Sequence, residues 1–151
     1  FYTDYIPRVD IMSDLEYLDR YYEPANASYL KLRNDPRFSP FVIKTLYMRQ
    51  SVSQTGHVYL TKPTQEMVDV LHVLSHEMLD RWLKYVDDAE PVPAEERAAL
   101  AARDLHIRRA IAERDPANPI GAKLFGEQMA ERLVRGLWGG DRQLPRAGEN
   151  A

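Results

Sequence analysis

The sequence predicts an all-α protein that folds as a compact bundle of about six helices in a single domain. Three observations predict this class. The ten prolines lie at or between segments with helical periodicity, never deep inside one. Several of these segments repeat apolar residues at intervals of three and four. Extended structure is suggested only at residues 57–60, a segment that we expect to be too short to make a sheet.

The first two predicted helices lie on either side of Pro24. One covers about residues 10–22, where Ser13 and Glu16 have the spacing of a capping box. The other follows Pro24 and continues to about Arg33.

The third predicted helix begins at Ser39 as N-cap, with Pro40 in the first helical position, and ends before Gly56. Its apolar residues wrap most of the circumference, so we expect it to be the buried centre of the bundle. These residues are Phe41, Val42, Ile43, Leu46, Tyr47, Met48 and Val52.

The fourth helix, from about Thr61 or Thr64 to Val86, is predicted most strongly, because its apolar residues form one continuous stripe. A fifth covers about residues 94–114 and has only a narrow apolar strip, which indicates a surface helix. A sixth covers about residues 119–138 and ends at two glycines. We expect residues 1–140 to form the single domain and residues 141–151 to be a disordered tail.

Composition excludes several classes of function. With no cysteine, the chain has no disulfide, no thiolate nucleophile and no cysteine-ligated metal. The 23 acidic and 20 basic residues are mixed along the chain, which argues against nucleic-acid binding. No apolar run is long enough for a membrane span and no signal segment is present, so the cytoplasm is the default expectation.

A polar strip on the fourth predicted helix is the candidate metal site. His72 and His76 are four residues apart, so both imidazoles could bind one divalent ion such as zinc or iron. Asp69 and Asp80 lie on the same strip, and His57 on the preceding loop could supply a third nitrogen. Hydrogen bonding of these side chains to neighbouring helices is the alternative, because one such histidine pair is a weak signal.

Tyrosines are concentrated in the first third of the chain, where they could form a surface for a protein partner or a second copy. Ordinary packing of side chains four residues apart explains the same pattern equally well. The tyrosines concerned are Tyr17, Tyr21, Tyr22 and Tyr29.

These features support three functional interpretations. The leading one is an accessory or regulatory domain that acts through protein contacts, since no catalytic constellation is complete. The first alternative is a metal-binding helical protein or enzyme that uses His72 and His76. The second is a domain that binds a small molecule in a pocket between helices, against which stands ordinary core packing. That pocket would be lined by Tyr47, Met48, Met67, Met78, Trp82 and Phe125.

Overall fold

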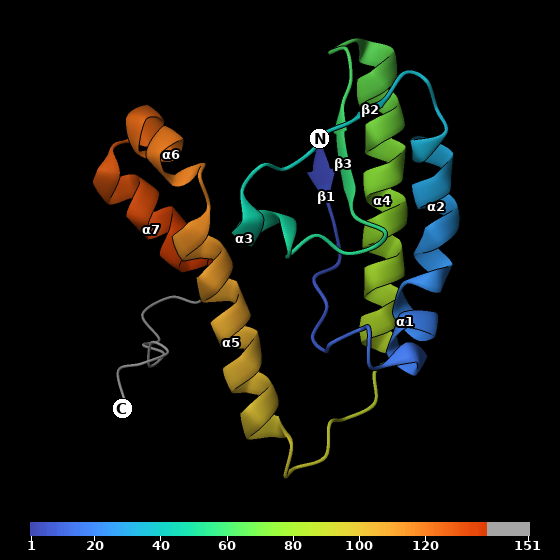
Figure 1. Cartoon of the computed structure of the whole chain (residues 1–151), viewed down its shortest axis with the longest axis vertical. Helices are drawn as coiled ribbons and strands as arrows, with labels where there is room; N and C mark the ends of the chain where they lie inside the picture. The colour runs from blue at the N-terminus through green and yellow to red at the C-terminus, as the bar shows by residue number, and fades with distance from the viewer. Residues whose placement is uncertain (139–151) are drawn as a thin grey trace. The chain divides into compact units, whose positions relative to one another are not determined.

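The computed structural model describes residues 1–138 and confirms a mostly helical protein. Within those residues there are seven helices and a small three-stranded antiparallel sheet (Figure 1). The chain divides into two compact units, the first made of residues 1–43 and 52–91 and the second of residues 44–51 and 92 onward. The single domain over residues 1–140 stays a prediction.

The helices of the first unit are α1 (Leu15–Tyr21), α2 (Glu23–Arg33) and α4 (Gln65–Asp87). Helix α1 begins later than predicted because the side chain of Asp14, not Ser13, caps it by accepting a hydrogen bond from the Tyr17 N–H. Helix α4 follows the prediction closely. The Thr64 side chain accepts from the Met67 N–H at its start.

Three short strands complete this unit: β1 (Tyr2–Thr3), β2 (Ser39–Pro40) and β3 (His57–Leu60). The order is β1-β3-β2, with Thr3 opposite His57 and Pro40 opposite Tyr59. The expectation that residues 57–60 are too short to make a sheet was therefore wrong. A four-residue strand is sufficient here because it is paired along both edges and buries alternate side chains against the core.

The third predicted helix is also wrong over most of its length. Pro40 lies in an edge strand, where its missing N–H costs nothing. The N–H of Phe41 donates to the Val58 carbonyl, which continues the sheet instead of starting a helix. Only α3 (Leu46–Arg49) is helical. Phe41 and Val42 are 50% and 69% exposed in the structure, so this segment is not a buried centre.

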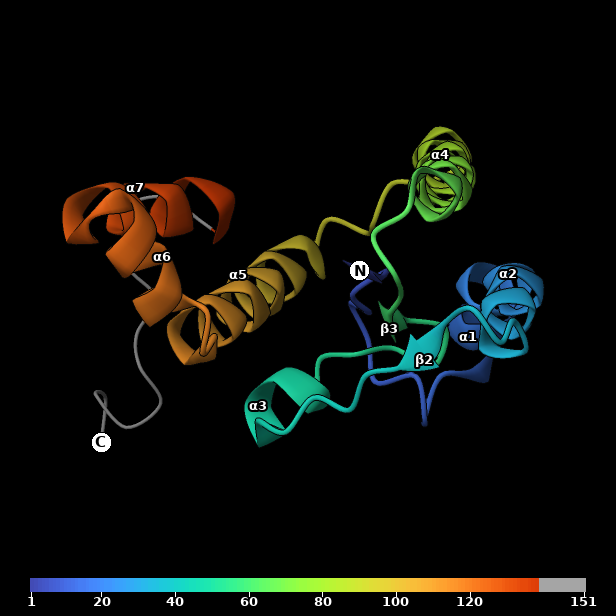
Figure 2. The same cartoon turned by 90° about the horizontal axis from the view of Figure 1, so that it is seen from above.

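The core of the first unit lies between α2, α4 and strand β3, which pack around one apolar cluster (Figures 1 and 2). Its buried members come from both helices, the strand and the turn after α2, and they are Leu32, Phe38, Tyr59, Met67 and Leu74. This packing fixes α4 beside α2 and so positions the polar residues toward the C-terminal end of α4.

The second unit contains α3, α5 (Arg97–Arg114), α6 (Asn118–Phe125) and α7 (Glu127–Trp138). The Arg114 guanidinium lies over the Tyr47 ring, 4.5 Å from its centroid. The single helix predicted for residues 119–138 is in fact two, because Gly126 adopts φ +80° and breaks it. The predicted tail at 141–151 lies outside the described residues.

None of the helices within residues 1–138 is both long enough and apolar enough to cross a membrane.

Candidate functional site

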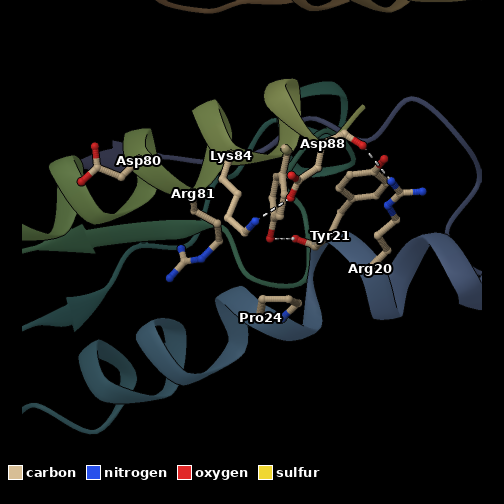
Figure 3. A pocket seen from close by; sticks show the side chains of 8 residues that line it. Arg20, Tyr21, Pro24, Asp80, Arg81, Lys84 and Asp88 are labelled. Carbon is tan, nitrogen blue, oxygen red and sulfur yellow. Dashed lines mark hydrogen bonds and ion pairs between the residues drawn. The ribbon is translucent and has the colours of Figure 1, made fainter. Parts of the chain in front are cut away.

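The first unit contains an open hollow of about 560 Å³ between the α1–α2 junction and the C-terminal half of α4 (Figure 3). Aromatic and charged side chains line it together, a composition that suits a ligand with both an apolar body and ionised groups. The lining residues are Arg20, Tyr21, Pro24, Asp80, Arg81, Lys84, Tyr85 and Asp88.

Asp88 contacts two of the three cationic side chains that line the hollow, which are Arg20, Arg81 and Lys84. The Lys84 ammonium lies 2.6 Å from an Asp88 carboxylate oxygen, and the Arg20 guanidinium donates to the Asp88 carbonyl at 3.2 Å. Arg81 instead donates to the hydroxyl oxygens of Tyr5 and Ser28, both at 3.3 Å. Asp80 points away from these groups in Figure 3.

Tyrosine rings form the rigid wall of the hollow. The Tyr85 hydroxyl donates to the Tyr21 carbonyl at 2.9 Å, and the two rings meet edge to face with centroids 5.1 Å apart. The Tyr5 ring also meets the Tyr85 ring edge to face, with centroids 6.1 Å apart. Burial raises the pKa of both Tyr5 and Tyr85, so these hydroxyls are neutral donors at physiological pH.

A layer of hydrogen bonds behind the wall connects it to the N-terminal segment. The Tyr5 hydroxyl donates to the Met78 carbonyl at 2.7 Å, and the buried Tyr22 hydroxyl donates to the Tyr5 carbonyl at 2.7 Å. Next to Tyr5, the Asp4 carboxylate accepts from the N–H groups of Ser53 and Tyr5 and from the Ser53 hydroxyl. Burial raises the Asp4 pKa, although these hydrogen bonds act in the opposite direction.

His57 lies on β3 and is only 1% exposed, with no hydrogen-bond partner for its Nδ1 atom. Burial, assisted by the positive charge of Arg81, lowers its pKa from 6.5 to about 4. His57 is therefore neutral at physiological pH.

A comparison with known protein families identifies the family of this chain. Residues 1–138 match the family model described as Red chlorophyll catabolite reductase (RCC reductase), and this match covers far more than half of the chain. The chain belongs to the red chlorophyll catabolite reductase family. No curated protein matches the sequence.

Membership of the RCC reductase family, whose name describes enzymes of chlorophyll breakdown, contradicts the leading interpretation of an accessory domain. That interpretation was drawn from the absence of a complete catalytic motif, which is weak evidence when a site is assembled from distant parts of a chain. The alternative of a helical enzyme is better supported.

The predicted metal residues are only partly brought together in this RCC reductase family member. The rings of His72 and His76 lie side by side on α4, with centroids 4.4 Å apart. Asp69 accepts a hydrogen bond from the Gln65 amide, and His57 lies in the sheet. Among residues 1–138 no group of three or more His, Asp and Glu side chains is placed to hold a metal ion. A metal at the histidine pair stays a prediction.

The tyrosines that were predicted to form an interface differ in their burial and in their contacts. Tyr22 is 2% exposed and hydrogen-bonded inside the first unit, so it does not contribute to an exposed partner surface as predicted. Tyr21 forms part of the hollow, its ring 4.6 Å from that of Tyr17. Tyr29 packs against His57. Packing four residues apart, the alternative weighed from the sequence, accounts for the contact between Tyr17 and Tyr21.

The predicted small-molecule pocket is not the hollow that the structure shows. Met67 and Met78 are buried in the first unit, where Met67 belongs to the core cluster, and Trp82 is half-exposed. Tyr47, Met48 and Phe125 belong to the second unit. Arg81 and Tyr85 were not predicted as site residues, although a cation and a tyrosine four residues apart on α4 were a signal that this face is not purely apolar.

Proposed function

We propose that this chain is an enzyme that reduces red chlorophyll catabolite. The observation that carries the proposal is the family match over residues 1–138, which includes every helix and strand of the described structure. As a product of chlorophyll breakdown, the substrate is a tetrapyrrole with a large conjugated surface.

The hollow in the first unit suits such a ligand. Tyr21 and Tyr85 provide fixed aromatic edges against which a conjugated ring can pack. Arg81 of α4 supplies positive charge at one side of that surface. Reduction of a double bond consumes a pair of electrons and a pair of protons. A reductant supplies the electrons and the solvent supplies the protons, while the residues of this chain bind the substrate and orient it.

The test is turnover of red chlorophyll catabolite under anaerobic conditions with a reduced electron donor, followed by loss of the red absorption. Wild-type protein should accelerate this loss over a blank without protein. Tyr85→Ala removes one wall of the hollow and should lower kcat/KM by about tenfold or more. No acceleration by the folded wild-type protein, with a donor that is shown to be competent, would contradict the proposal.

Leu83→Ala is the matched control for Tyr85→Ala. Leu83 is exposed and, at about 100° per residue, lies on the side of α4 opposite Arg81. Its substitution should leave kcat/KM within about twofold of wild type. Equal losses in both variants would show that the hollow is not where the substrate binds.

A further inference from the structure

We propose that Arg81 sets ligand specificity in the hollow: its guanidinium binds an ionised carboxylate on the ligand. The proposal rests on the proposed function for the identity of the ligand as a chlorophyll-derived tetrapyrrole. The anion site itself is derived from the geometry around Arg81.

Arg81 is a partly buried cation whose charge is not neutralised within the described structure. Its guanidinium nitrogens donate to the oxygens of Tyr5 and Ser28 at 3.3 Å, which are long bonds to neutral acceptors. In residues 1–138 it forms no ion pair with a carboxylate. Arg37, by contrast, bonds Asp35 and Glu66 at 2.6 Å, and Lys84 bonds Asp88 at the same distance. A partly buried guanidinium with five donors is best satisfied by an anion.

The neighbours of Arg81 orient it without competing for its charge. The Tyr5 hydroxyl uses its proton on the Met78 carbonyl, which leaves a lone pair for Arg81. Ser28 holds the other side of the guanidinium from α2. The side chain is thus fixed between α2 and α4 before any ligand arrives, which reduces the entropy lost on binding.

The acidic residues of the hollow do not occupy this site. Asp88 is bound by Lys84 and by Arg20, and Asp80 points away from Arg81 in Figure 3. Figure 3 also shows Arg81 reaching from α4 toward α2. Tyr21, Tyr85 and Arg81 line the same hollow, so a large ring system that packs on the tyrosines can extend to Arg81.

A carboxylate is the anion that this ligand class supplies. Chlorophyll carries a propionate side chain that is esterified with its hydrocarbon tail, and removal of the tail leaves a flexible arm ending in a carboxylate. Arginine matches a carboxylate with two parallel hydrogen bonds, and its planar fork fixes the direction from which the group approaches.

The test measures equilibrium binding of red chlorophyll catabolite with its propionate free and as the methyl ester, by visible difference spectroscopy without any reductant. Wild-type protein should bind the free acid about tenfold or more tightly than the ester. Arg81→Gln should lower affinity for the acid to the level of the ester and leave ester binding nearly unchanged. Arg81→Lys, which keeps the charge and loses the fork, should retain part of the preference and serves if Arg81→Gln does not fold.

Lys84→Gln is the matched control, because Lys84 lies one turn away in the same hollow but is paired with Asp88. It should keep the preference for the acid. The proposal is overturned if wild-type protein binds acid and ester equally, if Arg81→Gln weakens both equally as a merely structural residue would, or if Lys84→Gln removes the preference. Turnover without an acid preference would refute the Arg81 site alone, and an acid preference without turnover would refute the proposed activity alone.

Discussion

Substitution of Gly56 by alanine should destabilise the first unit by about 2–5 kcal/mol. A Cβ atom at this position would lie 2.6 Å from an Asp4 carboxylate oxygen and 2.7 Å from a Val52 methyl group, so one neighbour must move. Movement of the carboxylate breaks its bonds to the Ser53 and Tyr5 N–H groups. Charge-assisted hydrogen bonds contribute about 1.5–3 kcal/mol each, and the loss is reduced by about 0.4–1 kcal/mol because alanine restricts the unfolded chain.

The assay is urea unfolding followed by tryptophan fluorescence in a Trp138→Phe background, so that Trp82 alone reports on the first unit. Gly136→Ala is the matched control, because a Cβ there meets nothing within 4 Å and the residue lies in α7. It should be neutral or slightly stabilising for its own helix and silent in the Trp82 signal.

A double-mutant cycle shows whether Asp4 transmits the effect. In an Asp4→Ala background, where the carboxylate is already gone, Gly56→Ala should cost less than in wild type. If Gly56→Ala leaves the unfolding free energy unchanged in the wild-type background, the contact between Asp4 and the Gly56 position does not stabilise the first unit through the hydrogen bonds of Asp4.

Three further results are expected. The His57 pKa lies at about 4 in the folded protein and near 6.5 in the unfolded chain, so folding stability falls by up to about 3 kcal/mol as the pH drops from 6.5 toward 4. Urea unfolding at pH 7 and pH 5 should show this loss in wild type and a weaker loss in His57→Gln, and identical losses would contradict the prediction. Tyr22→Phe removes the hydroxyl that donates to the Tyr5 carbonyl at 2.7 Å, and it should lower the free energy of unfolding by about 1–2 kcal/mol. Tyr21→Phe, at a more exposed position, should lower it by less than about 0.5 kcal/mol, and equal losses would be evidence against the Tyr22 hydrogen bond. Arg37→Gln should return the Asp35 pKa from about 2 toward its usual value near 3.8 in an NMR titration, since hydrogen bonds from Arg37 are the main cause of the shift, and an unchanged pKa would exclude that cause.

The helices that the sequence predicted well are those defined by local pattern. Helix α4 follows from its continuous apolar stripe and from Thr64 as cap, and α5 follows from residues of high helix propensity. The helix predicted over residues 39–56 was wrong because the structure of this segment depends on strand pairing with residues farther along the chain. Residues 39–41 look like a helix start locally, but the Phe41 N–H is satisfied by Val58, and pairing across such a distance leaves no local signal.

The same reason explains why the candidate site was missed. Arg81 looks like a partner for nearby acids on its own helix, yet its hydroxyl partner Tyr5 is 76 positions away in sequence. Tyr22 was read as an interface residue because tyrosine has a polar tip, and its hydroxyl is in fact satisfied internally by Tyr5. Periodicity identified the face of α4, and tertiary contacts decided which side chains on it remain available to a ligand.

Mass spectrometry of the reaction product tests the proposed reductase activity most directly. The purified chain is incubated with red chlorophyll catabolite and a reduced electron donor, and the tetrapyrrole is analysed before and after. The family assignment and the tyrosine-walled hollow predict a product heavier by one pair of hydrogens, formed faster with wild-type protein than with Tyr85→Ala. Unchanged substrate mass in the presence of folded protein and an active donor would contradict the proposed function.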